Sequence, residues 1–423
     1  MKIALLSEKY TPDIGGLAIS TERFARLLSS AGYNVHVFSP TPSTTLRTSL
    51  SLLPSEKRTL THSGVSVTRF GAHKRVDDTL VDWFEILVEE YRQQPFDVLH
   101  AYFLTQAGFV ATYAGKYLNV PSVVSIRGND IERAAFDPSK FSHVMYALHN
   151  ASAVTTNANE LVKKAKAFFD REVILIPNGI DTGHFKPMER KESLAEALGL
   201  RRNVILSEAT LAPHASAGEN LSSDIRVSSV ALNGLLQSDM VPVIGFVGEL
   251  REKKGLRTLL SAYATINKKR PVALLIVGEV RQGEDKQAFE EFAKDNPNAK
   301  IVVTGYVSHN DLPAYHSLID VFVHPSLRDG MPNAVLEAMA CEKAVVATPV
   351  GGILDVVKDG ENGILIPVND EDALANAMNE VLNNAELRNR LGKAARQTII
   401  NGFSLQKELH GNLDIYRRLG LNP

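Results

Sequence analysis

Short apolar segments alternate with amphipathic stretches along most of this chain, and no other feature restricts its fold as strongly. Segments that are apolar throughout are typical of parallel strands buried on both faces. The stretches between them have helical spacing, as in residues 20–31, where Phe24 and Leu28 fall on one side. The pattern predicts an α/β fold with a doubly wound parallel sheet. The strands expected in the first part are residues 2–7, 34–39, 65–70, 97–100, 122–126, 153–156 and 173–176.

The second part of the chain repeats this plan. A chain of 423 residues is too long for one hydrophobic core. We expect one Rossmann-like domain in residues 1–187 and a second in residues 188–403, with helix 404–423 packing back on the first. Residues 201–240 lack a clean period and are interpreted as an excursion of the second domain. The strands expected there are residues 243–247, 273–277, 301–304, 321–323, 344–347 and 363–366.

Composition excludes several classes of protein. Lys and Arg number 46 and Asp and Glu 48, so the net charge of −2 argues against a dedicated nucleic-acid binder. Cys341 is the single cysteine, which excludes an internal disulfide and a zinc ribbon. No apolar stretch is long enough for a membrane span, and the apolar start is too short for a signal peptide. We therefore expect a cytoplasmic protein.

Two Rossmann-like domains that face each other enclose a cleft, and ligands bind there beyond the carboxyl ends of the strands. The loop after the first strand carries Gly15 and Gly16, which allow close approach of a ligand; a tight turn is the simpler interpretation. The loop after strand 122–126 carries Arg127, Gly128 and Asp130. A structural salt bridge is the alternative to a role of this loop in ligand binding.

Two loops of the second domain carry more charge. The loop after strand 243–247 contains Gly248, Arg251 and Lys254, whose cations suit phosphate groups, although a solvated charge cluster is the commoner case.

The loop after strand 321–323 runs from Asp329 through Pro332 into an apolar helix that contains Glu337. The start of this helix favours a diphosphate, and carboxylates accept hydrogen bonds from sugar hydroxyls. A second glycine pair, Gly351–Gly352, follows strand 344–347 and offers backbone contacts to phosphate.

These motifs together resemble those of glycosyltransferase family 4. The run Ile176-Pro-Asn-Gly-Ile-Asp181-x-x-x-Phe185-x-Pro187 resembles the signature that closes the family's N-terminal domain. Residues 329–337 resemble the family's E-x7-E motif, and Lys254-Gly255 matches the end of its G-R-L-x-x-x-K-G stretch. The resemblance implies a GT-B fold and a retaining, metal-independent transfer of a hexose from a nucleotide-diphosphate sugar.

The resemblance also implies roles for single residues. Glu337 would bind the donor ribose, Asp329 the hydroxyls of the donor sugar, and Lys254 the diphosphate. Gly15 and Gly16 would approach the diphosphate or the acceptor from the other domain. The predicted catalytic residues are Lys254, Asp329, Glu337, Arg127 and Asp130. The predicted donor-binding residues are Gly15, Gly16, Gly248, Arg251, Gly330, Met331, Pro332, Asn333, Glu337 and Gly351.

Three departures from the family pattern affect the charge of the site. Glu249 replaces the arginine of G-R-L, Arg127 replaces the histidine of H-G-x-D, and Asp329 is one methylene shorter than glutamate. Arg127, Arg251 or Arg328 is a candidate to supply the lost positive charge. The alternatives are a non-catalytic protein that binds sugar nucleotides, which Glu249 and Arg127 favour, and another GT-B activity such as an epimerase.

The expected partners are a nucleotide-sugar donor and a hydroxyl acceptor on a glycan or a lipid-linked sugar, with no nucleic acid, no cofactor and no metal. Asp370-Glu371-Asp372 contains an Asp-x-Asp, but it opens a helix, where acids act as caps. Residues 161–171 form a basic amphipathic stretch. A core helix with solvated lysines is the favoured interpretation, and peripheral contact with the inner membrane face is the alternative.

Overall fold

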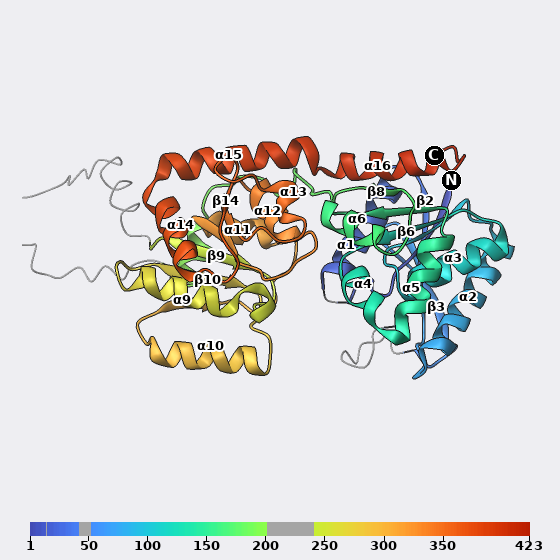
Figure 1. The fold of residues 1–423 in the computed structure, drawn as a ribbon, viewed down its shortest axis with the longest axis horizontal. Helices are drawn as coiled ribbons and strands as arrows, with labels where there is room; N and C mark the ends of the chain where they lie inside the picture. Colours follow the sequence, from blue (N-terminus) through green and yellow to red (C-terminus); the bar gives the residue numbers. More distant parts are fainter. Residues whose placement is uncertain (14, 42–51, 201–240) are drawn as a thin grey trace, which may run out of the picture.

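A computed structural model describes residues 1–13, 15–41, 52–200 and 241–423, and it contains two α/β domains (Figure 1). The N-terminal domain has an eight-stranded sheet in the order β3-β4-β2-β1-β5-β6-β7-β8. Its neighbouring strands are parallel except for β3, which is antiparallel to β4. The strands are β1 (Lys2–Leu6), β2 (Asn34–Pro40), β3 (Lys57–His62), β4 (Val65–Phe70), β5 (Val98–Ala101), β6 (Ser122–Ile126), β7 (Ala153–Thr156) and β8 (Val173–Leu175).

Helices cover both faces of this sheet, because successive strand residues point to opposite sides. On β1, Ala4 and Leu6 belong to one apolar core, and Ile3 and Leu5 belong to another. The helices described in this domain are α1 (Gly16–Ser30), α2 (Val76–Gln93), α3 (Gln106–Leu118), α4 (Asn129–Glu132), the 3-10 helix η1 (Ala134–Phe136), α5 (Pro138–Asn150) and α6 (Asn159–Lys166).

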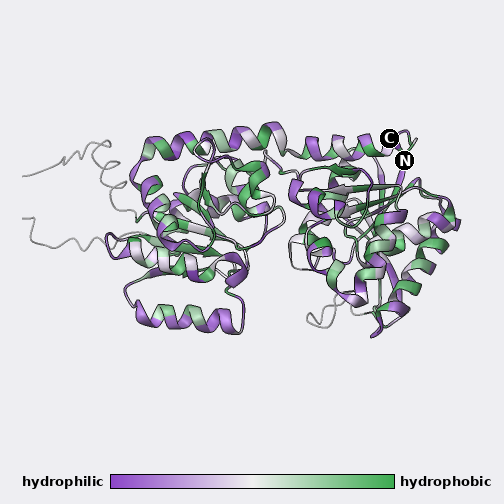
Figure 2. Ribbon diagram, viewed as in Figure 1, coloured by the Kyte–Doolittle hydropathy of each residue, from purple (hydrophilic) through white to green (hydrophobic). Residues whose placement is uncertain are grey.

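The C-terminal domain has a parallel six-stranded sheet in the order β11-β10-β9-β12-β13-β14. Its strands are β9 (Val243–Val247), β10 (Ala273–Val277), β11 (Lys300–Val303), β12 (Val321–His324), β13 (Ala344–Ala347) and β14 (Ile364–Leu365). Its helices are α7 (Glu192–Ala197), η3 (Glu252–Lys254), α9 (Leu256–Asn267), α10 (Glu284–Asp295), α11 (Leu312–Leu318), α12 (Asn333–Ala340), α13 (Ile353–Val356), α14 (Glu371–Asn383) and α15 (Ala385–Gly402). The strands are apolar and the outer helices amphipathic (Figure 2).

The last two helices follow each other along both domains: α15 lies on the C-terminal domain, and α16 (Leu405–Arg418) returns to the N-terminal one (Figure 1). The hydroxyl of Tyr416 lies 2.8 Å from His100 Nδ1 on β5. Glu408 forms an ion pair of 3.2 Å with Arg23 on α1. The chain therefore crosses between the domains twice, and the two crossings touch where Ile180 N donates to the Phe403 carbonyl.

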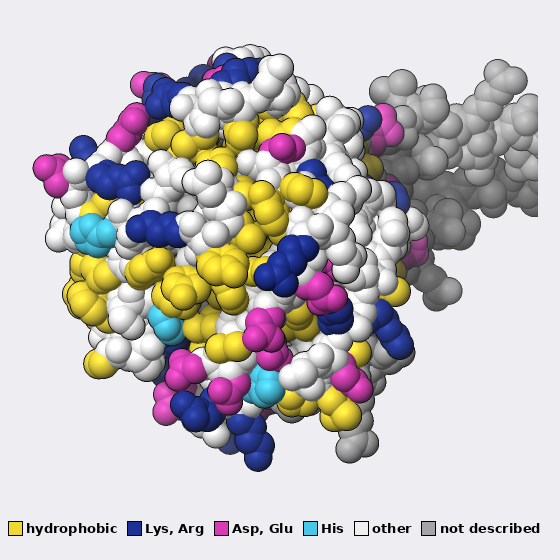
Figure 3. All heavy atoms as spheres, turned by 90° about the vertical axis from the view of Figure 1, so that its right-hand side faces the viewer, with side chains coloured by type: hydrophobic (Ala, Val, Ile, Leu, Met, Phe, Trp, Pro, Cys, Tyr) yellow, Lys and Arg dark blue, Asp and Glu magenta, His cyan; other side chains and the backbone are white. Residues whose placement is uncertain are grey.

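The end of the N-terminal domain presents apolar side chains among polar ones (Figure 3). Tyr113 and Tyr117 on α3 are about half exposed, and both rings contact Phe84 on α2 at centroid distances of 5.3 Å. No helix in the described part of the chain is long and apolar enough to cross a membrane.

Each strand expected from the sequence is present, with bounds that differ by a residue or so in several cases. Asp370 caps α14 by accepting a hydrogen bond of 2.8 Å from Ala373 N, which confirms the helix-cap interpretation. The predicted excursion at 201–240 lies outside the described residues. Strand β3 was not predicted, because its six residues are all exposed and carry no apolar pattern.

Candidate active site

In the C-terminal domain, a glycine turn brings the loop that contains Lys254 against the loop that follows β12. Gly255 has a φ of 79° and caps α9. A Cβ at this position would lie 2.1 Å from the Pro325 carbonyl oxygen, so only glycine permits the approach. As a result Lys254, the last residue of η3, forms an ion pair with Asp329 Oδ2.

Asp329 is held as an anion by two neighbours. Burial alone would raise the pKa of its carboxyl group, but Lys254 and His324 outweigh burial and hold that pKa well below its usual range. His324 Nε2 lies 2.9 Å from Asp329 Oδ2 and 2.9 Å from Ser326 Oγ. Burial lowers the pKa of His324, so a neutral imidazole orients the carboxylate.

The loops after β12 and β13 meet at the start of α12. Gly351 has a φ of 54°, and a Cβ there would lie 1.9 Å from the Asp329 carbonyl oxygen. Gly352 N donates to the Gly330 carbonyl at 2.5 Å. Pro332, which was expected in the first helical turn, is the N-cap residue of α12 and directly precedes Asn333, where the helix begins. The start of this helix follows Asp329 and Gly330 in the chain, and the first N–H groups of a helix favour an anion.

Glu337 is on α12 and only 4% exposed. Its Oε1 lies 2.9 Å from His309 Nε2 in the loop after β11. Met331 is buried, and a Cβ on Gly352 would lie 2.6 Å from its methyl carbon. The predicted donor residues from 329 to 337 therefore occupy one turn and one helix, with the two acids held by different histidines.

The side chains of Arg127 and Asp130 form no ion pair with each other in the described structure, so a salt bridge between them is not the role of this loop. Asp130 is fully buried and accepts hydrogen bonds from the backbone N–H groups of Arg127 (3.0 Å), Leu104 (3.2 Å) and Ile131 (3.0 Å). Burial raises the pKa of Asp130 to about 6. Its carboxylate thus positions the loop rather than facing the cleft, whereas Arg127 lies over the ring of Tyr102 at 3.8 Å.

The two domains meet at these loops. A Cβ on Gly128 would lie 3.8 Å from Gly330 Cα. Asn178, in the segment that leaves the N-terminal domain, accepts from Arg127 Nη1 at 2.8 Å and donates to Asn333 Oδ1 at 2.8 Å. Asn333 Nδ2 in turn donates to Ser20 Oγ on α1 at 3.2 Å. A chain of side-chain hydrogen bonds therefore joins α12 to the N-terminal domain.

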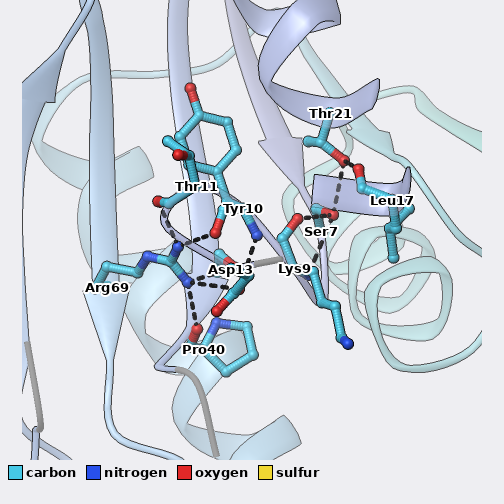
Figure 4. A network of polar contacts seen from close by, with 10 residues as sticks. Ser7, Lys9, Tyr10, Thr11, Asp13, Leu17, Thr21, Pro40 and Arg69 are labelled. Carbon is cyan, nitrogen blue, oxygen red and sulfur yellow. Dashed lines mark hydrogen bonds and ion pairs between the residues drawn. The ribbon is translucent and has the colours of Figure 1, made fainter. Parts of the chain in front are cut away.

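The glycine loop before α1 is held by a buried arginine (Figure 4). Arg69 on β4 is 2% exposed and donates to the carbonyls of Thr11 and Pro40 at 2.7 Å and to that of Tyr10. Asp13 Oδ2 accepts from Tyr10 N at 3.0 Å and lies 3.4 Å from Arg69 Nη1. A Cβ on Gly15 or Gly16 would meet no atom of the described residues within 4 Å.

Two further predicted residues, Gly248 and Arg251, lie in the loop after β9. Arg251 pairs with Glu249 at 3.1 Å, so the acid that departs from the family pattern already engages that candidate cation. Gly248 follows β9, with a φ of 127°, and a Cβ there would meet no described atom within 4 Å. Within the described residues, no group of three or more His, Cys, Asp or Glu side chains is placed to hold a metal ion.

Both halves of the chain match known families. Residues 14–184 match the model described as glycosyltransferase family 4, and residues 233–398 match that of glycosyl transferases group 1. An uncharacterized glycosyltransferase of Methanocaldococcus jannaschii is 24% identical over 446 residues, which cover 99% of each chain. The UDP-Gal:alpha-D-GlcNAc-diphosphoundecaprenol alpha-1,3-galactosyltransferase of Escherichia coli is 26% identical over 352 residues, which cover 81% of this chain and 80% of that enzyme.

Solved structures show the same architecture. Anabaena HepE in complex with UDP aligns with a TM-score of 0.72 at 19% identity, covering 99% of this chain and 100% of that chain. Sucrose-phosphate synthase from Thermosynechococcus elongatus aligns with a TM-score of 0.73 at 20% identity, covering 99% and 98%. The fold and these matches define a GT-B glycosyltransferase. The chain belongs to the family 4 type, as its sequence motifs predicted.

Proposed function

We propose that this glycosyltransferase moves a hexose from a nucleotide-diphosphate sugar to a hydroxyl of a glycan or lipid-linked sugar, with retention of the anomeric configuration and without a metal or other cofactor. The ion pair of Lys254 with Asp329 at the start of α12 is the observation that carries the proposal. It places one fixed cation and one fixed anion beside the start of a helix.

Each group has a part in this reaction. Departure of the nucleotide develops negative charge on the β-phosphate, and Lys254 and the helix start would stabilise it. Asp329, kept ionised by Lys254 and His324, would accept hydrogen bonds from donor-sugar hydroxyls. Glu337, oriented by His309, would bind the ribose. In this scheme the donor phosphate replaces Asp329 as a partner of the Lys254 ammonium group.

The names of relatives support both the proposed nucleotide-sugar donor and the proposed sugar acceptor. The Escherichia coli relative uses UDP-Gal and acts on a sugar joined to diphosphoundecaprenol. A capsular polysaccharide biosynthesis glycosyltransferase of Staphylococcus aureus is 33% identical over 169 residues, which cover 39% of this chain and 43% of that one. These relatives support a nucleotide-sugar donor, a sugar acceptor and a role in polysaccharide biosynthesis.

The test is donor turnover without acceptor. The full chain is incubated with UDP-, GDP- and ADP-hexoses in EDTA, and the anomer released at early times is read by proton NMR. We expect slow release of free sugar from one donor, with the donor's own anomeric configuration. Loss of turnover in EDTA would contradict metal independence, and the inverted anomer would contradict retention.

A non-catalytic sugar-nucleotide-binding protein is the second candidate, favoured by the Glu249–Arg251 pair. That pair places an acid where the family pattern has a phosphate-binding arginine. Thermal-shift and turnover measurements on the same samples separate the two candidates. Stabilisation by a nucleotide sugar with no release of sugar, with or without acceptors, would favour the binding protein.

A further inference from the structure

Two adjoining pockets open between the domains beside the proposed donor site. The outer one has a volume of about 330 Å³ and the inner one about 260 Å³. They share Glu132, Lys164 and Arg328 in their walls, so the two pockets are adjacent. The inner pocket also contacts Asp329 and Gly351. A ligand in the outer pocket can therefore extend a hydroxyl group toward the reacting sugar.

Aromatic and aliphatic side chains form one wall of the outer pocket. Phe136 from η1 and Phe168 after α6 meet edge to face, with ring centroids 5.7 Å apart. Phe136 is 73% exposed, and Ile131 is buried behind the pocket. Leaving a phenylalanine ring in water is unfavourable, so this wall suits a hydrocarbon chain.

Cations also line this pocket. Arg133 comes from the N-terminal domain, and Lys253 and Arg328 come from the C-terminal domain. None of these three forms an ion pair with any residue that the structure describes. Burial lowers the pKa of Lys253, and the nearby Lys254 and Arg251 lower it further, whereas Asp329 and Glu132 act in the opposite direction. The pocket thus concentrates uncompensated positive charge, which favours an anion.

The fourth basic residue already has acidic partners. Lys164 Nζ lies 2.6 Å from Glu132 Oε1 and also pairs with Glu160. Lys164 and Phe168 both belong to the basic stretch 161–171, whose Leu161 and Ala165 are buried in the core. The side of this stretch that carries Lys164 therefore faces the cleft between the domains.

We propose that the outer pocket binds the diphosphate and the first hydrocarbon units of an acceptor whose sugar is linked through a diphosphate to an apolar chain. Arg133, Lys253 and Arg328 hold the diphosphate, the Phe136–Phe168 wall holds the chain, and the sugar extends through the inner pocket to Asp329. This inference rests on the proposed function and chooses the lipid-linked acceptor over the free glycan.

Farnesyl diphosphate, which joins a diphosphate to a short hydrocarbon chain, tests the pocket directly by calorimetry below its micellar concentration. We expect it to bind at least tenfold more tightly than inorganic diphosphate or farnesol. Phe136→Ser should weaken farnesyl diphosphate about tenfold and leave inorganic diphosphate unchanged. Arg133→Gln should weaken both diphosphates. The matched controls Phe141→Ser and Lys163→Gln change exposed residues outside both pockets and should bind like the wild type.

Four outcomes would overturn the proposal. They are no binding of farnesyl diphosphate, equal binding of farnesyl and inorganic diphosphate, no effect of Phe136→Ser, and loss of farnesyl diphosphate binding in Lys254→Ala, which would place the ligand in the donor site. Donor hydrolysis is measured on the same samples and should be unchanged in Phe136→Ser and Arg133→Gln. Hydrolysis without farnesyl diphosphate binding refutes only the pocket. Absence of hydrolysis from the wild type refutes the proposed function instead.

Discussion

The two domains present glycine turns to the same cleft, but the turns are stabilised in different ways. In the C-terminal domain a Cβ on Gly255 or Gly351 would lie about 2 Å from a neighbouring carbonyl oxygen, at 2.1 Å and 1.9 Å. In the N-terminal domain a Cβ on Gly15 or Gly16 would meet no described atom within 4 Å, and buried Arg69 holds their loop through backbone carbonyls. The C-terminal half of the cleft is fixed by close packing. The N-terminal half is fixed by the hydrogen bonds of Arg69 to backbone carbonyls and by its ion pair with Asp13, which together are called the polar clamp.

The strongest test of this contrast is Gly351→Ala against Gly16→Ala. A methyl group at residue 351 would collide with the Asp329 carbonyl at a φ of 54°, so the Asp329 loop must shift. We expect donor hydrolysis to fall about 100-fold, as displacements near 1 Å do in active sites. Gly16→Ala should keep the wild-type melting temperature. Equal melting temperatures for the two variants would show that packing does not distinguish the two turns.

Removing the polar clamp formed by Arg69 should destabilise the N-terminal domain. Arg69→Ala leaves three backbone carbonyls and Asp13 without their buried partner, and we expect a loss of about 3 kcal/mol in the free energy of unfolding. Arg69→Lys should recover part of it, because an ammonium group lacks the guanidinium fork. Arg75→Ala removes an exposed arginine and serves as the control in urea denaturation. An Arg69→Ala variant as stable as Arg75→Ala would remove the clamp from the account.

Asp130 and Asp329 give their loops opposite pH dependences, because the pKa of Asp130 is raised and that of Asp329 is lowered. Burial raises the pKa of Asp130 to about 6 in the folded chain, whereas an unfolded aspartate titrates near 3.9. Between these values the folded chain keeps a proton that the unfolded chain has lost, so stability falls as pH rises. This group contributes about 2 to 3 kcal/mol across that window. The slope of stability against pH should be smaller in Asp130→Asn, and identical slopes would contradict the assignment.

The smallest expected effect concerns the contact between the domains. Asn178 donates to Asn333 Oδ1 at 2.8 Å, so Asn178→Ala, Asn333→Ala and the double variant form a thermodynamic cycle. We expect a coupling of about 1 kcal/mol in the free energy of unfolding, the usual size for one hydrogen bond. Strict additivity of the two single changes would mean that this bond does not couple the domains.

Much of this fold could be predicted because buried parallel strands are continuous apolar runs. Strand β3 could not, since its Lys57–His62 residues are exposed on the sheet edge and read as a polar loop. Helix α1 begins at Gly16, four residues before the stretch 20–31 in which the sequence shows helical spacing. The sequence did not reveal this first turn, because the turn lies next to the glycine loop.

The site could be predicted less fully than the fold. The rule that ligands bind beyond strand ends correctly placed Lys254 and Asp329 in loops after β9 and β12. It could not identify Arg69 or Asn178, because their partners are far away along the chain and the contacts exist only after folding. His324 ends β12 five positions before Asp329, and that spacing was the one local signal that a search could have used.

The central claim is that Lys254 stabilises the departing nucleotide, and donor hydrolysis by Lys254→Ala tests it most directly. The matched control is Lys268→Ala, which changes an exposed lysine at the other end of α9. We predict that Lys254→Ala lowers the rate of sugar release by about 100-fold to 1,000-fold while the variant stays folded, and that Lys268→Ala keeps the wild-type rate. Sugar release at the wild-type rate in a folded Lys254→Ala variant would contradict the account.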